Sequence, residues 1–141
     1  MLNIYRAAAI LAGVVFVALP SAQPASADIV VQINKSSQTM SVIVDGVQRY
    51  TWAVSTGVGG TPSGTFRPQH LDRFHRSALY GDAPMPHSIF YSGNFAIHGT
   101  TYVGRLGRPA SHGCVRLHPS HAAVLYSLVQ RQMGSTRIHI Y

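Results

Sequence analysis

The chain contains a single cysteine, Cys114, in the run Ser111-His112-Gly113-Cys114, and a second His-Gly pair, His98-Gly99, lies upstream. A thiol attacks as its thiolate, and a free cysteine titrates at about 8.5, so little of it is ionised at neutral pH. A neighbouring imidazole can take the thiol proton and later return it to a leaving amine. These residue types therefore predict nucleophilic catalysis by Cys114, with His98 or His112 as its base.

The glycine between His112 and Cys114 favours His98 as the base. It indicates a tight bend, in which the backbone N–H groups of His112, Gly113 and Cys114 turn towards one point and form an oxyanion hole. His98 ends a separate apolar stretch and can approach the thiol from across the site. None of the four acidic residues lies near either histidine in sequence. The Gly99 carbonyl is therefore the predicted acceptor that orients the ring of His98.

Two other interpretations of these residues stay open. A lone cysteine is most often an inert, buried hydrophobe. Alternatively, zinc could be held by a set of nitrogen and sulfur ligands, namely His98, His112, Cys114 and His118. The paired spacings typical of zinc sites, such as CxxC or HExxH, are absent from the sequence. We therefore expect neither a metal nor a cofactor.

Strands dominate the part of the chain that must position these side chains. Segments 29–34, 39–44 and 47–55 predict a three-stranded meander, and Asp45-Gly46 predicts a type I′ hairpin turn between the second and third strands. Four glycines and a proline make residues 56–66 a shaped loop.

The segment 67–86 shows no sustained period and predicts an irregular, exposed excursion that could form one wall of a groove. Further along, we expect short strands and one helix in these segments: strands 87–91, 94–98 and 136–141, and a helix over 119–132. The predicted fold is mainly β, a small sandwich or barrel with one packed α-helix near the C-terminus.

The N-terminal residues 1–27 are typical of a signal peptide. Arg6 precedes an apolar run over 7–19, and Ala25-Ser26-Ala27 is a small-x-small cleavage pattern. An uncleaved anchor is the alternative, but the apolar run is short for a membrane span, which needs about 20 residues. We therefore expect residues 28–141 to form one exported domain in the periplasm or cell wall.

The net charge of residues 28–141 indicates which kinds of molecule the domain could bind. Without Arg6, ten basic residues stand against four acidic ones, so residues 28–141 carry a formal net charge of +6. A basic exported protein can meet anionic wall polymers or lipid headgroups. Nucleic acid is not an expected partner outside the cell.

The sequence around the cysteine resembles the L,D-transpeptidase catalytic domain, also called the YkuD domain. The likeness rests on His98-Gly99 and on the run 106–117, which contains Ser111-His112-Gly113-Cys114. It extends to Val54-Ser55-Thr56-Gly57 and to 61–66, which look like the glycine-rich stretch of the family, and to the helix near Leu125. The resemblance thus covers nearly all of residues 28–141.

The resemblance implies a reaction on the stem peptides of peptidoglycan. Cys114 would attack the carbonyl of the third residue, release the terminal D-alanine and form a thioester that an amine captures. The amine can come from another stem peptide, which gives a 3→3 cross-link, from a wall-anchored protein or from a free D-amino acid. His98 matches the base of the family, and Ser111, His112 and Gly113 match its other motif positions.

Two further residues could contact the substrate, and two functions other than transpeptidation are possible. Arg116 could pair with a substrate carboxylate or be structural, and Tyr91 could line the peptide groove together with Phe90. Water could replace the amine, which would make the protein an L,D-carboxypeptidase or another peptidoglycan hydrolase. The third possibility is an inactive wall-binding module, although the intact motif speaks against it.

Overall fold

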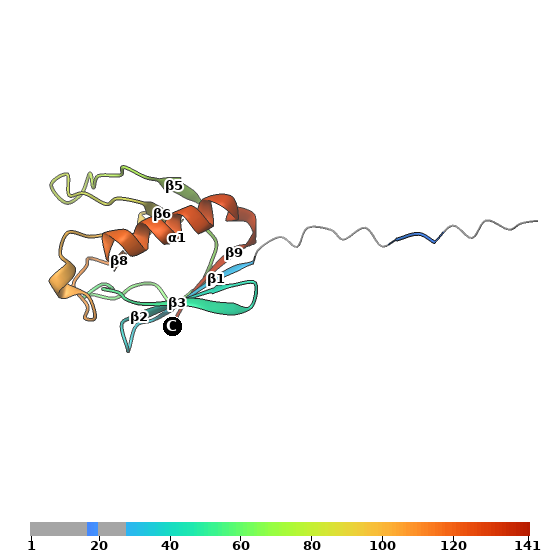
Figure 1. Cartoon of the computed structure of the whole chain (residues 1–141). Coiled ribbons are helices and arrows are strands. Elements are labelled where there is room, and N and C mark those ends of the chain that lie inside the picture. Colours follow the sequence, from blue (N-terminus) through green and yellow to red (C-terminus); the bar gives the residue numbers. More distant parts are fainter. Residues whose placement is uncertain (1–16, 20–27) are drawn as a thin grey trace, which may run out of the picture.

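The computed structural model describes residues 17–19 and 28–141, and its folded part consists of two β-sheets, one α-helix and two short 3₁₀ helices (Figure 1). The predicted signal peptide, residues 1–27, lies outside the described residues except for 17–19. The strands are β1 (Ile29–Asn34), β2 (Thr39–Val44), β3 (Val47–Ala53), β4 (Gly64–Phe66), β5 (His70–Asp72), β6 (Ser88–Ser92), β7 (Phe95–Gly99), β8 (Val115–Leu117) and β9 (Thr136–Ile140). The helices are α1 (Pro119–Arg131), η1 (Val103–Arg105) and η2 (Met133–Ser135).

The first sheet has five strands in the order β3-β2-β1-β9-β4. The hairpin between β2 and β3 turns at Asp45 and Gly46, whose φ angles of 51° and 76° are both positive. Positive φ at both central positions defines the predicted type I′ turn, which is confirmed. The last strand, β9, pairs in parallel with β1 and antiparallel with β4, so the C-terminal strand lies inside the sheet.

The second sheet has four strands in the order β5-β6-β7-β8. A hairpin joins β6 to β7, whereas β8 runs parallel to β7. A parallel pair requires a crossover connection, and here residues 100–114, which include η1, provide it. The crossover delivers the Ser-His-Gly-Cys run to the start of β8, beside β7.

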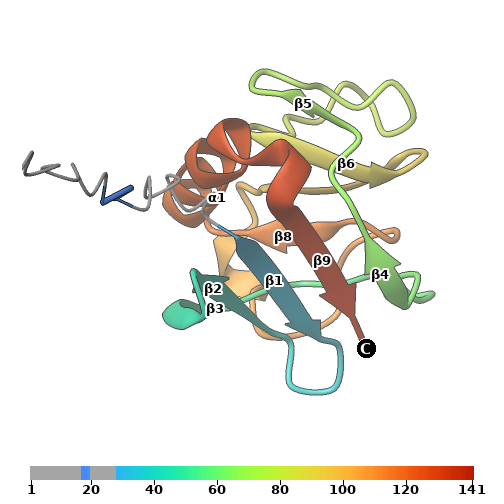
Figure 2. The same ribbon diagram turned by 90° about the vertical axis from the view of Figure 1, so that its right-hand side faces the viewer.

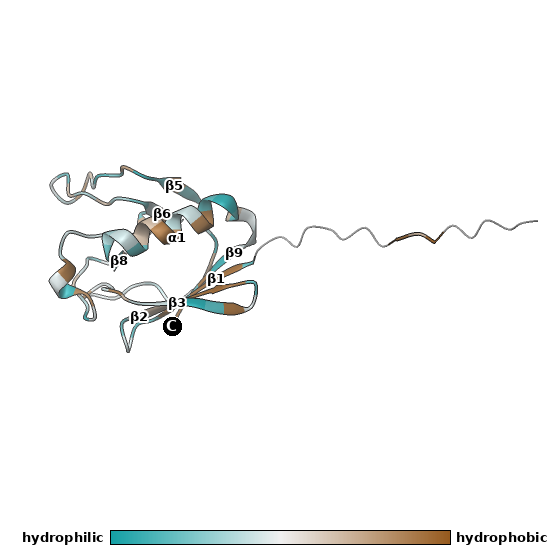
Figure 3. Ribbon diagram, viewed as in Figure 1, coloured by the Kyte–Doolittle hydropathy of each residue, from teal (hydrophilic) through white to brown (hydrophobic). Residues whose placement is uncertain are grey.

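Helix α1 packs beside both sheets. Pro119 occupies the first turn, where its missing N–H costs nothing, and the Nδ1 atom of His118 accepts a hydrogen bond from the Ser120 N–H at 3.2 Å. In Figure 3, α1 carries brown and teal patches along its length. Its buried side chains, Ala122, Leu125, Tyr126 and Val129, join the main core. The packed helix predicted from the sequence is therefore present.

Alternating strand residues form this core. Every second residue of β1 and of β9 is fully buried, namely Ile29, Val31 and Ile33, and Thr136, Ile138 and Ile140. Ile89, Ile97, Val115 and Leu117 of the second sheet belong to the same cluster. The fold is mainly β, two sheets with one C-terminal helix, as the sequence predicted.

Three short strands differ from the predictions. The predicted loop 56–66 ends in β4, the predicted irregular excursion 67–86 contains β5, and the motif is followed at once by β8. Each has three residues, too few for an alternating pattern to be visible in the sequence. Strand β3 ends at Ala53 rather than at residue 55, and Ser55 forms an isolated bridge with Arg116 instead.

Among residues 17–19 and 28–141, no helix has the length and apolar character to span a membrane.

Candidate active site

Strands β7 and β8 present the predicted site residues on one face. In their parallel register His98 lies beside Arg116, and Ile97 beside Val115. Since side chains alternate along a strand, Val115 and Leu117 enter the core while Cys114 and Arg116 point to the opposite face. His98 lies on that face too. The pleat thus brings the nucleophile and base predicted from the sequence to the same side of the sheet.

The ring of His98 is buried and held by its own neighbour. Its exposed fraction is 5%, and its Nδ1 atom lies 2.7 Å from the Gly99 carbonyl oxygen. A carbonyl can only accept, so Nδ1 carries the proton and Nε2 is left as the acceptor nitrogen of the ring. Burial lowers the pKa of His98 to about 4, with the Arg116 and His75 charges acting in the same direction and the Gly99 hydrogen bond opposing them. The imidazole is therefore neutral at neutral pH.

The thiol of Cys114 packs against an apolar cluster of Met85, Phe90 and Ala96. Burial raises the pKa of Cys114, whereas a hydrogen bond with the Ala96 backbone and the nearby Arg116 charge lower it less strongly. The sulfur lies 3.7 Å from the Asn94 carbonyl oxygen, to which it donates. In the free protein the sulfur therefore keeps its proton.

The residues before Cys114 form a tight turn held by Ser111. The hydroxyl of Ser111 donates to the Cys114 carbonyl at 2.5 Å and accepts from the Gly113 N–H at 3.1 Å. Gly113 has a φ of 138°, and a Cβ at this position would lie 2.5 Å from the Phe95 ring. The predicted bend at Gly113 is confirmed.

The turn also corrects the predicted oxyanion hole. The Gly113 N–H is used inside the turn by Ser111, so it is not available to a substrate oxygen. The N–H groups of His112 and Cys114 remain as the candidates from the predicted set of three.

The glycine-rich loop, residues 56–66, packs against the turn that precedes Cys114 and is hydrogen-bonded to it. Thr61 accepts a hydrogen bond from the Gly57 N–H at 2.8 Å, and its hydroxyl donates to the Gly113 carbonyl at 2.8 Å. A Cβ on Gly57 would lie 2.8 Å from the Gly113 Cα. The two backbones therefore approach too closely for any side chain at position 57.

The loop is tied in turn to the β1–β2 connection. The buried Gln38 amide donates to the Thr56 hydroxyl at 2.7 Å and accepts from the Thr56 N–H at 2.9 Å. Lys35, the only lysine, donates to the Thr61 carbonyl at 2.9 Å and to the Ser63 hydroxyl at 2.6 Å. These bonds connect the first sheet to the turn that carries Cys114.

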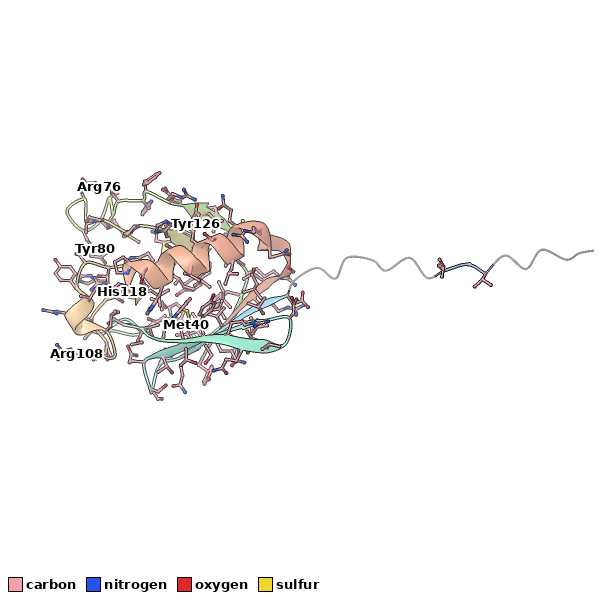
Figure 4. All side chains as sticks on the ribbon, viewed as in Figure 1. Met40, Arg76, Tyr80, Arg108, His118 and Tyr126 are labelled. Carbon is pink, nitrogen blue, oxygen red and sulfur yellow. The ribbon has the colours of Figure 1, made fainter. Side chains whose placement is uncertain are left out.

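A cavity of about 1190 Å³ opens above the sulfur, and His98, Ser111, His112, Cys114 and Arg116 all line it. One wall is formed by the excursion, through residues 75–85. The Tyr80 ring stacks on the His112 ring with centroids 4.2 Å apart. Figure 4 shows Arg76, Tyr80 and Arg108 at the same end of the molecule. The irregular excursion is thus the groove wall that the sequence suggested.

Arg116 lies half-buried in this cavity. Its guanidinium donates to the Ala110 carbonyl at 3.2 Å and lies 5.7 Å from the centre of the Tyr102 ring. The side chain therefore braces the crossover and still reaches the cavity, so both roles considered for it from the sequence stay compatible with its position.

Tyr91 is not in the cavity, which corrects the prediction that it lines the peptide groove. It is only 2% exposed and belongs to the main core, with its ring 5.1 Å from that of Phe66. Its neighbour Phe90 does line the cavity. Alternation along β6 explains the difference, because successive side chains enter opposite faces of the sheet.

Sequence reasoning assigned no part to Asn94, Ala96 or Tyr80. Asn94 and Ala96 act through their backbones, which leave no signature in the sequence, and Tyr80 lies in a segment without a pattern. Within residues 17–19 and 28–141, no three His, Cys or acidic side chains gather in a way that could hold a metal ion.

Comparison with known proteins points to one family. The L,D-transpeptidase catalytic domain family (YkuD) matches residues 28–140. An L,D-transpeptidase from Mycobacterium smegmatis has 25% identity and a TM-score of 0.73, over 82% of this chain and 59% of that one. One from Stackebrandtia nassauensis has 25% identity and a TM-score of 0.69, over 88% of this chain and 60% of that one.

A third structure, residues 123–326 of the L,D-transpeptidase from Xylanimonas cellulosilytica, is 24% identical with a TM-score of 0.71, over 84% of this chain and 63% of that one. The chain thus spans about three fifths of the length of these structures. No curated protein matches it. On the match over residues 28–140 and the shared fold, the chain belongs to the L,D-transpeptidase catalytic domain (YkuD) family, whose enzymes act on peptidoglycan.

Proposed function

We propose that the protein is an exported cysteine L,D-transpeptidase that acts on peptidoglycan stem tetrapeptides. The observation that carries the proposal is that Cys114 and His98 line one cavity, with the ring of His98 oriented by the Gly99 carbonyl. A nucleophile, a base and a third group that fixes the base are the parts that acyl transfer requires.

Acylation begins when Nε2 of His98 takes the proton of Cys114 and the sulfur bonds to the carbonyl carbon of the third stem residue. The carbonyl oxygen becomes an oxyanion, for which the N–H groups of His112 and Cys114 are the proposed donors. His98 then gives its proton to the amine of the terminal D-alanine, the C–N bond breaks, and a thioester remains on Cys114.

Deacylation reverses these roles. An acceptor amine loses a proton to His98 and attacks the thioester carbon, and the sulfur leaves and regains its proton from His98. The acceptor is a second stem peptide, which gives a 3→3 cross-link, or a wall-anchored protein or a free D-amino acid. Ser111 holds the turn through its two hydrogen bonds, and Arg116 offers a guanidinium to a substrate carboxylate.

The segment 1–27 is proposed to direct export and to be removed after Ala27. The support is the sequence pattern of Arg6, the apolar run 7–19 and the Ala-x-Ala site. N-terminal sequencing of exported protein should start at Asp28; a retained Met1 would contradict cleavage.

The reaction is tested with purified muropeptides that carry tetrapeptide stems, with mass spectrometry of the products. Cross-linked dimers are expected, because the apolar cluster around the sulfur disfavours water. If tripeptide monomers were the only products, the protein would be a hydrolase rather than a transpeptidase. If the substrate stayed unchanged, only a wall-binding role would be left. The Cys114→Ala variant is the control and should yield no product.

A further inference from the structure

A second depression, of about 490 Å³, lies at the edge of the first sheet where the chain crosses from β4 to β5. Figure 2 shows β4 beside β9 and the connection that leads from β4 towards β5. Its polar lining includes Thr65, Arg67, Gln69, Ser92 and Arg137. Ser92 also lines the Cys114 cavity, so the two hollows adjoin at the end of β6.

Two arginines line this depression, Arg67 and Arg137. The ladder between β4 and β9 ends at the pair of Phe66 and Ile138, and the two arginines are the neighbours of these residues in the sequence. Their guanidinium groups give this edge of the sheet a concentration of positive charge.

Neither arginine has an acidic partner. The two ion pairs among residues 28–141 join His75 to Asp72 and Arg76 to Asp82. Arg67 donates one hydrogen bond, to the Gly134 carbonyl at 3.1 Å. Arg137 makes no side-chain hydrogen bond or ion pair within the described part of the chain.

A buried aromatic residue, Tyr91, forms part of the wall of this depression. Tyr91 lines the depression, is 2% exposed, and its hydroxyl has no hydrogen-bond partner among the described residues. A buried polar group is nearly always hydrogen-bonded, so an unsatisfied one calls for an explanation. The guanidinium groups present donors in a planar fork that fits carboxylate and phosphate oxygens.

We propose that this depression binds an oxyanion, a carboxylate or a phosphate, carried by the wall polymer. Since the depression adjoins the catalytic cavity at Ser92, one polymer can occupy both hollows. The identity of the polymer rests on the proposed function, whereas the binding of an oxyanion does not.

The first test titrates the Cys114→Ala protein with inorganic phosphate and with acetate, followed by NMR. The variant cannot turn over substrate, so a failure of the transpeptidase proposal leaves this test unaffected. Backbone shifts are expected at 65–69 and 136–138, and the double variant Arg67→Gln/Arg137→Gln should weaken binding by at least about tenfold. Arg49→Gln/Arg131→Gln is the control, because it removes the same charge from two exposed arginines elsewhere.

Equal weakening in the two double variants would overturn the site, since net charge alone would then account for binding. Absence of shifts at these two segments would overturn it as well. The second test measures sedimentation of the same proteins with sacculi before and after hydrofluoric acid, which removes phosphodiester-linked polymers. Loss of the binding that depends on Arg67 and Arg137 identifies phosphate as the oxyanion, and its retention identifies carboxylate.

Discussion

Burial keeps the side chains of Cys114 and His98, the proposed nucleophile and base, neutral in the free protein. It lowers the pKa of His98 to about 4 and raises that of Cys114, so a preformed thiolate–imidazolium pair is disfavoured. The sulfur instead donates to the Asn94 carbonyl. In the proposed reaction, the thiolate is therefore generated by proton transfer to His98 as the substrate is attacked, which is general base catalysis.

Alkylation of the thiol by iodoacetamide reports on this state directly, because Cys114 is the only cysteine. Since burial raises its pKa, the rate should rise continuously from pH 7 into the alkaline range without a plateau near neutrality. The rate is measured by intact-protein mass spectrometry. A plateau near pH 6–7 would instead indicate a preformed thiolate.

At the scale of single residues, the sequence named most of the side chains that line the candidate site. Cys114, His98, Gly99 and Ser111 could be named from residue types and from the family likeness, because chemistry fixes which side chains are needed. Tyr91 was placed on the wrong face, because a short run of apolar residues does not reveal which of two neighbours enters the core.

The secondary-structure elements hold Cys114, the proposed nucleophile, through contacts with the backbone. Cys114 precedes a strand of three residues, β8, and the turn before it is fixed by Thr61 of the glycine-rich loop. That loop is fixed by Gln38. In the proposed reaction, rigid placement of the turn lets the N–H groups of His112 and Cys114 meet a developing oxyanion.

Substitution of Thr61 tests this support. Thr61→Val keeps the shape of the side chain but removes the hydroxyl that joins Gly57 to Gly113, and should destabilise the protein by about 1–3 kcal/mol. It should also lower kcat more than it raises KM, because the hydroxyl touches no substrate. Stability is measured by urea unfolding and activity with muropeptides.

Thr61→Ser is the matched control, since it retains the hydroxyl and should keep most of the stability and activity. If Thr61→Ser were as impaired as Thr61→Val, the methyl group rather than the hydrogen bonds would explain the effect.

The longer elements were predictable and the supporting contacts were not. Alternation over six residues marked β1, and Asp45-Gly46 marked the hairpin turn that joins β2 to β3. The links between Gln38 and Thr56 and between Thr61 and Gly113 join residues 18 and 52 positions apart. Such pairings depend on the tertiary fold and leave no local pattern in a single sequence.

For the whole molecule, the lowered pKa values of buried histidines make the free energy of unfolding depend on pH. Burial lowers the pKa of His98, His87 and His121, so the unfolded chain binds protons that the folded protein does not. Stability is then fully present above about pH 6.5 and falls with pH towards the folded pKa of His98, about 4.

The midpoint of thermal unfolding should therefore fall steeply between pH 6.5 and pH 4. His98 contributes on the order of 3 kcal/mol to this dependence, given its shift from 6.5 to about 4. His98→Gln should flatten the curve of unfolding midpoint against pH. Calorimetry across this pH range measures the unfolding midpoint. If the midpoint of His98→Gln fell with pH as steeply as that of the unaltered protein, the buried ring would not be the source of the pH dependence.

The most direct measurement of the central claim is capture of the acyl-enzyme. The protein is mixed with a tetrapeptide muropeptide, quenched in acid within seconds and examined by intact and peptide-level mass spectrometry. We predict an adduct of the muropeptide without its terminal D-alanine, bound to Cys114, removed by hydroxylamine and absent from Cys114→Ala. Product formation by Cys114→Ala, or turnover in which no adduct can be trapped on Cys114, would contradict the account.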